Sequence, residues 1–118
     1  MHPCVKAKHG TRLYQQKTPE SIRSEFDEFD IEAHAIFIDF ERQYGGLVFK
    51  GRNNNWYFRL TPAENFTKEG ILFVEFVEPC VAQPYFYFLG QNGEIYAAMN
   101  QEAWEIAASL SEFLEEYI

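Results

Sequence analysis

The sequence predicts an α+β domain, in which two N-terminal helices precede a mainly antiparallel sheet of about five strands and a short C-terminal helix. Three observations predict this class. Apolar residues follow a helical spacing up to Tyr44, they alternate with polar residues from Leu47 onward, and Ser109-Leu110-Ser111-Glu112 is a capping-box sequence before a last helical stretch. Helices on either side of a run of strands are typical of an antiparallel sheet with helices gathered largely on one face.

The composition fits one globular domain over residues 1–118, with residues 1–17 as a loosely held basic arm. The chain has 118 residues, 47% of them hydrophobic, and its 12 Phe and 7 Tyr argue for a packed core and against disorder. Met1 to Lys17 lacks the apolar segment of a secretion signal, and nothing approaches a membrane span, so we expect a cytoplasmic protein without a membrane partner. Cys4 and Cys80 are expected to be reduced thiols, with a single disulfide left open.

The formal charge of −8 is unevenly distributed. The arm has four basic residues and no acid, whereas Thr18 to Gly45 has eight acids against two bases, and Gln101 to Ile118 has five acids and no base. Such a charge repels nucleic acid and attracts basic proteins, so we expect no nucleic-acid partner. Solubility alone is the competing explanation of the excess acid.

Two helices are expected before the sheet. Thr18-Pro19-Glu20 supplies a capping hydroxyl, a proline at the first helical position and an early acid. A second, longer helix is expected over Ile31 to Tyr44, with Asp30 as its N-cap. Gly45 or Gly46 then supplies the left-handed residue that closes this helix, so the glycines shape the backbone and do not cradle a phosphate.

The strands follow from alternation and turn signals. A first strand is expected over Leu47 to Lys50, and Pro84 to Leu89 is expected to be a central strand, joined through Asn92-Gly93 to an antiparallel strand over Glu94 to Met99. Core-facing positions in the two intervening strands are Trp56, Phe58, Leu60, Leu72, Val74 and Phe76. The last helix could start at Glu102 or after Ser109. The later start is favoured, with Trp104 to Ala108 as an extended approach.

No arrangement of residues indicates an enzyme, a metal site or a cofactor. His2, Cys4, His9 and Cys80 match no common zinc spacing. Carboxylates cluster at a helix break, where a solvated acidic corner is favoured over a catalytic pair.

We consider two surfaces as candidate partner-binding sites. The first is this acidic corner, with Glu25, Asp27, Glu28 and Asp30. The second is the side of the strands turned away from the core, with Tyr57, Arg59, Phe73, Glu75, Tyr85 and Tyr87. The alternative is that the arm or the last helix covers this second surface, so that it is not open to a partner.

Several segments together resemble a known family. They are the helix end Phe40-Glu41-Arg42-Gln43-Tyr44-Gly45-Gly46-Leu47, the aromatic strands, the hairpin Asn92-Gly93-Glu94-Ile95-Tyr96 and the closing segment Ile106 to Leu114. In order and spacing they are similar to the SUKH superfamily of immunity proteins, which is related to a yeast cell-wall regulator. The resemblance carries over Tyr44, Gly45 and Gly46 as structural residues.

The resemblance implies a function by binding. Its bacterial members capture a cognate toxin, often a nuclease or deaminase, in the cytoplasm of the producing cell, and no catalytic residue comes with the family. The expected partner is therefore a toxin protein, and an acidic chain gains electrostatic steering toward a basic nuclease. The alternatives are a small ligand-binding or hydrolytic domain that uses the acidic corner, and a regulatory scaffold with several protein partners. The oligomeric state is left open.

Overall fold

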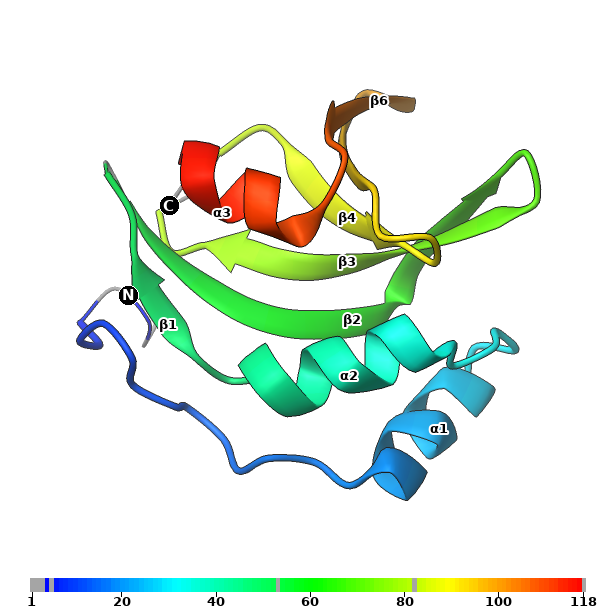
Figure 1. Ribbon diagram of the computed structural model, residues 1–118, viewed down its shortest axis with the longest axis horizontal. Coiled ribbons are helices and arrows are strands. Elements are labelled where there is room, and N and C mark those ends of the chain that lie inside the picture. Colours follow the sequence, from blue (N-terminus) through cyan, green and yellow to red (C-terminus); the bar gives the residue numbers. More distant parts are fainter. Residues whose placement is uncertain (1–3, 5, 53, 82, 118) are drawn as a thin grey trace.

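Three helices and one six-stranded antiparallel sheet make up the described part of the protein (Figure 1). The computed structural model describes residues 4, 6–52, 54–81 and 83–117. The helices are α1 (Pro19–Asp27), α2 (Ala35–Tyr44) and α3 (Leu110–Tyr117). The strands are β1 (Val48–Lys50), β2 (Asn55–Lys68), β3 (Ile71–Pro79), β4 (Phe86–Gly90), β5 (Ile95–Met99) and β6 (Glu102–Ala107).

The strands follow one another across the sheet in chain order, β1 to β6, and every neighbouring pair is antiparallel. The α+β prediction is confirmed, with six strands where about five were expected. The additional strand is β6, which lies where only an extended approach was predicted. Asn100 and Gln101 form the two-residue turn before it, both in the left-handed region with φ of 54° and 68°. Neither residue is glycine, which is why the turn was not recognised.

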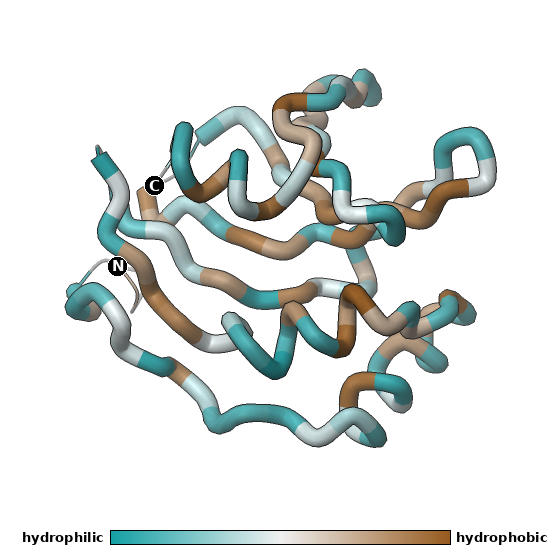
Figure 2. The backbone as a smooth tube through the Cα atoms, viewed as in Figure 1, coloured by the Kyte–Doolittle hydropathy of each residue, from teal (hydrophilic) through white to brown (hydrophobic). Residues whose placement is uncertain are grey.

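The main core lies between the sheet and the helices. Figure 2 shows hydrophobic positions in the strands and helices and a mainly hydrophilic N-terminal arm. The six core positions predicted in β2 and β3 are all buried in this cluster, together with Phe113 of α3. Phe113 contacts the rings of Trp56 and Phe76 with centroids 6.0 and 5.3 Å apart, so α3 is packed onto the same face as the core of β2 and β3.

The boundary between α1 and α2 differs from the prediction. Thr18 caps α1 as expected, because its hydroxyl accepts the backbone N–H of Ser21 at 3.1 Å. Asp30, however, does not cap α2. It adopts a left-handed φ of 55°, and the following Ile31 N–H returns to the carbonyl of Phe26 at 3.3 Å. Asp30 therefore terminates α1 in a Schellman-like turn, and α2 begins only after His34.

The glycine pair and the terminal helix follow the predicted pattern. Gly46 has a φ of 87° and supplies the left-handed residue after α2. At the C-terminus, Ser109 Oγ accepts the N–H of Glu112 at 3.2 Å, and Glu112 Oε2 accepts the N–H of Ala108 at 3.1 Å. This reciprocal capping starts α3 after Ser109, so the later of the two predicted starts is confirmed.

Candidate functional site

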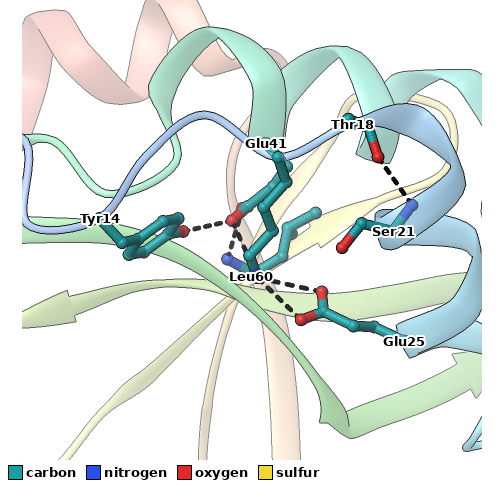
Figure 3. Close-up of polar contacts among 7 residues, drawn as sticks. Tyr14, Thr18, Ser21, Glu25, Glu41 and Leu60 are labelled. Atoms are coloured by element: carbon teal, nitrogen blue, oxygen red, sulfur yellow. Dashed lines mark hydrogen bonds and ion pairs between the residues drawn. The ribbon is translucent and has the colours of Figure 1, made fainter.

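A buried carboxylate, Glu41, joins α2 to the arm and to β2 (Figure 3). Its side chain is only 1% exposed. The hydroxyl of Tyr14 donates to Oε1, and the backbone N–H of Leu60 donates to Oε2 at 3.0 Å. The ammonium of Lys17 lies 3.6 Å from Oε1 and also pairs with Glu25 at 2.9 Å. Glu41 thus holds three segments together, as expected of a buried charge whose oxygens are all bonded.

The close packing at the end of α2 explains why glycine follows it. A Cβ atom on Gly45 would lie 2.6 Å from Glu41 Oε1, so a side chain there would displace the buried carboxylate. Burial, then the hydrogen bond to Glu41 and the charge of Glu41, raise the pKa of Tyr14 well above its usual value. The phenol therefore stays protonated and serves as a donor to Glu41. The Glu41 cluster is therefore structural, because its polar groups bond to one another.

The N-terminal arm is held more firmly than predicted. Its backbone pairs with β1, since Gly10 N–H donates to Val48 O at 2.7 Å and Val48 N–H donates to Thr11 O at 2.8 Å. The Arg12 guanidinium also donates to Gly45 O at 2.6 Å. The expectation of a loosely held arm is wrong for the residues described, because these bonds cover the outer edge of β1.

A disulfide between Cys4 and Cys80 adds a covalent tie between the arm and the end of β3. The expectation of two reduced thiols is therefore wrong. The Cα atoms are 5.7 Å apart, and the pair lies in a small second cluster with the buried side chains of Val48 and Tyr57. The linkage closes a loop with a sequence separation of 76 residues. The two cysteines are far apart in the sequence, and they meet only because the arm packs against β1 and β2. The sequence alone therefore did not indicate this pairing.

The predicted acidic corner lies at the end of α1. Asp27, Glu28 and Asp30 are exposed, and Phe29 among them is 43% exposed. Glu25 is partly buried, and its carboxylate is paired with Lys17. Three of the four predicted contact residues are thus available to a partner, while Glu25 contributes to the attachment of the arm.

The second predicted surface does not form one face. Ala97 of β5 lies opposite both Tyr87 of β4 and Trp104 of β6, and Tyr87 and Ala97 belong to the main core. Tyr85, two residues before Tyr87, shares its side of the sheet. Residues on the opposite side include Tyr57, Arg59, Phe73 and Glu75. Tyr57, Glu75 and Tyr87 are also buried, at 6%, 7% and 5% exposure, so the prediction of one continuous contact face is wrong.

Part of the outward side is covered by an aromatic cluster. Phe66 stacks on Phe73 with ring centroids 4.8 Å apart and contacts Phe88 at 4.9 Å. Tyr96 packs against Phe73 at 4.5 Å, and the Lys68 ammonium lies 5.3 Å from the Tyr96 ring centroid. The register shifts in β2 on either side of Thr61 accompany this arrangement. Phe73 is therefore buried by Phe66 from the far end of β2 and by Tyr96 of β5. The predicted cover by the arm or by the last helix does not explain its burial.

An open aromatic groove lies on the helix-facing side, between α3 and the strands β4 to β6. Its first part is a cavity of about 250 Å³. The lining residues are Tyr85, Tyr87, Ala97, Trp104, Ile106 and Tyr117. An adjoining cavity of about 290 Å³ shares Tyr85, Tyr87 and Tyr117 and adds Arg52 and Glu116. We call these two cavities together the aromatic groove.

The aromatic groove presents large side chains beside negative charge. Tyr85 and Trp104 are each 38% exposed, and their rings meet edge to face with centroids 5.9 Å apart. Five carboxylates lie within residues 101–118, on β6 and α3, and all are exposed. They are Glu102, Glu105, Glu112, Glu115 and Glu116. Half-exposed Tyr and Trp rings are typical anchors in protein interfaces, so this groove is the candidate binding site.

A second buried carboxylate, Glu75, lies on the outward side of β3. Burial raises its pKa to about 7, and the charges of Glu78 and Glu64 act in the same direction, while Thr61 and Arg59 oppose them. Glu75 lines a cleft of about 220 Å³ with Glu78, Gln83 and Phe86 among its walls. At neutral pH this carboxyl group is divided between its protonated and ionised forms.

Replacement of this group, Glu75→Gln, is expected to stabilise the protein increasingly as the pH rises. Between the usual value of 4.5 and about 7 the folded state keeps a proton that the unfolded state has lost, so wild-type stability falls with rising pH. The stability difference between the variant and the wild type should grow by about 3 kcal/mol over this range. Urea titrations at several pH values measure it. Exposed Glu69→Gln, whose charge does not act on Glu75, is the control, and a difference that does not change with pH would contradict this account.

Two other kinds of site are absent from the described ranges 4, 6–52, 54–81 and 83–117. There, no helix is long and apolar enough to cross a bilayer. No group of three or more His, Cys, Asp or Glu side chains in those ranges could hold a metal ion. Of the weak metal candidates in the sequence, Cys4 and Cys80 are joined to each other, His9 accepts the N–H of Lys50 at 2.8 Å, and His2 lies outside the described residues.

Of the residues that line the groove, Tyr85 and Tyr87 were predicted as contact residues, whereas Trp104 and Tyr117 were missed. Trp104 was expected only in an extended approach to the last helix, although the alternation of Trp104 and Ile106 is a strand signal. Comparison with known proteins adds no relative, since no family model, curated protein or solved structure matches the chain. The function is therefore inferred from the surfaces described above.

Proposed function

We propose that this protein is an immunity-type binding protein, which neutralises a cognate toxin domain, such as a nuclease or deaminase, by forming a one-to-one complex inside the producing cell. The observation that carries the proposal is the aromatic groove, which has Glu116 in its wall and further exposed carboxylates on β6 and α3, the elements that border it. Tyr85 and Trp104 provide desolvatable contact area, and the five acids of residues 101–118 provide a negative field.

Charge complementarity supports a basic partner. The chain carries a net charge of −8, and a protein that acts on nucleic acid needs a basic substrate surface. An acidic protein that docks on such a surface occludes the substrate and is attracted to it at long range. The resemblance of the helix end, the hairpin and the closing segment to the SUKH superfamily supports the same proposal.

A small ligand-binding domain is the second candidate, and Glu75 is the observation that favours it. A carboxyl group with a pKa of about 7 in a cleft is a frequent feature of ligand sites. The acidic corner, where this alternative was first placed, has exposed carboxylates instead. The variant Glu75→Gln separates the two candidates, because toxin binding through the groove should be unchanged by it.

The test begins with the neighbouring gene. We expect it to encode a secreted protein with a toxic C-terminal domain, and titration of that purified domain with this protein should give a saturable one-to-one complex. The association rate constant should fall roughly tenfold between low and physiological salt, because steering is screened. A basic protein without toxin activity, such as lysozyme, controls for nonspecific attraction. No complex with the neighbouring domain, or an equal complex with the control, would overturn the proposal.

A further inference from the structure

The two edge strands of the sheet, β1 and β6, differ in whether another segment pairs with their outer side. The edge of β1 is paired with the arm through the backbone bonds of Gly10 and Thr11 to Val48. At the other edge, β6 pairs with β5 alone among the described residues, and it stands at the margin of the sheet in Figure 1. An edge strand offers a row of backbone donors and acceptors to any extended segment that can approach it.

The side chains of β6 restrict which segment can approach. Glu102 and Glu105 are both exposed on this six-residue strand. Glu105 lies opposite Tyr96, on the face of β6 that points away from the groove. Like charges that face each other across paired strands are destabilising, so a second copy of β6 that set Glu105 against Glu105 would be repelled, whereas a Lys or Arg side chain on that face of an added strand would be attracted.

The aromatic groove lies directly beside this edge. Trp104 belongs to β6 itself, and together with Tyr85 and Tyr117 it lines the cavity on the helix-facing side. An apolar side chain on an added strand would point to this side at every second residue. Backbone pairing and a side-chain pocket therefore occur together, which is the usual basis of recognition by strand addition.

We propose that the edge of β6 and the aromatic groove bind an extended segment of the partner as a seventh strand, in which basic residues alternate with apolar ones. This inference rests on the proposed function, because it assigns the segment to the toxin. Glu105 lies opposite Tyr96 on the outward face of β6, so its carboxylate receives a basic side chain of the added strand. Trp104 lies opposite Ala97 on the other face, which Glu102 shares, so the groove at Trp104 receives an apolar side chain.

The test uses a single-tryptophan protein and synthetic peptides. The chain has 2 Trp, and Trp56 is buried, so Trp56→Phe leaves the half-exposed Trp104 as the reporter. A nine-residue peptide of alternating Lys and Val should shift the Trp104 emission to shorter wavelength in a saturable manner. Two control peptides keep either the pattern or the charge. One has Glu in place of Lys, and the other has Pro in place of Val and cannot pair as a strand.

Charge variants of the protein complete the design. Glu105→Lys should weaken peptide binding about tenfold, because the attraction to a basic side chain becomes a repulsion. The matched variant Glu28→Lys at the acidic corner should leave the affinity within about twofold. Circular dichroism confirms that both variants fold.

Three results would overturn the inference. They are no shift with the Lys and Val peptide, an equal shift with either control peptide, or a shift that depends only on protein concentration, which would make a second copy the occupant. Failure of the proposed function is recognised separately, because it appears as absence of a complex with the neighbouring toxin domain. Toxin binding that persists without any peptide binding would place the toxin on another surface and overturn only this inference.

Discussion

Glu41→Ala is expected to destabilise the protein by about 3–5 kcal/mol, because it removes a buried acceptor that serves both the arm and β2. The substitution leaves the Tyr14 hydroxyl and the Leu60 N–H without their bonds in a region where Glu41 is only 1% exposed. A domain of this size has a total stability of about 5–15 kcal/mol, so the loss is a large share of it. Urea unfolding at neutral pH measures the change.

Two further variants define what the Glu41 measurement means. Asp39→Ala removes an exposed carboxylate from the same helix and should change stability by no more than about 0.5 kcal/mol. Glu41→Gln keeps one oxygen acceptor and should fall between the two. A loss for Glu41→Ala as small as that for Asp39→Ala would show that the buried carboxylate does not hold α2, β2 and the arm together.

Replacing both cysteines, Cys4→Ser with Cys80→Ser, is expected to cost about 4 kcal/mol of unfolding free energy. The disulfide closes a loop with a separation of 76 residues, and such a loop restricts the unfolded chain considerably. Because the linkage also anchors the arm to the end of β3, hydrogen exchange at the amides of Gly10 and Val48 should accelerate in the variant. Thermal unfolding and exchange together measure both effects.

Reduction of the wild-type protein provides the matching comparison. Dithiothreitol should lower the melting temperature of the wild type to that of the double variant and leave the variant unchanged. Under the proposed function the complex forms inside the producing cell, where thiols are kept reduced, so the comparison also tells which redox form must bind the toxin. Equal melting temperatures for the oxidised, reduced and substituted proteins would contradict a stabilising disulfide.

The parts of the fold that could be predicted depend on local signals. The Thr18 cap, the left-handed Gly46, the hairpin at Asn92-Gly93 and the capping box at Ser109 each act within a few residues. In each case the side chain, or the ability of glycine to adopt a positive φ, favours one local conformation. These elements were correctly placed because no distant contact is needed to form them.

The errors arose where distant contacts decide. Asp30 is a good capping residue, but here the backbone turns left-handed to end α1 against Phe26, so the predicted start of α2 was four residues early. The strand β6 depends on pairing with β5 through a turn without glycine. Local propensity described each segment adequately, and tertiary pairing determined its final state.

The candidate site was the least predictable part. Alternation placed Tyr85 and Tyr87 on one side of their strand, but the pairing of Tyr87 with Ala97 puts that side toward the helices. The bulge in β3 between Glu75 and Val77 also changes which residues share a face. Whole-sheet register is needed to connect Trp104 with Tyr85, and the sequence contains no local sign of it.

Growth protection tests the central claim, that this protein neutralises a toxin by binding it, most directly. Cells that express the toxic domain encoded beside this gene should survive when the wild-type protein is co-expressed. The double variant Tyr85→Ala with Trp104→Ala should lose at least about tenfold in protection while it remains folded and equally abundant. Death of the cells in the presence of abundant, folded wild-type protein would contradict the account.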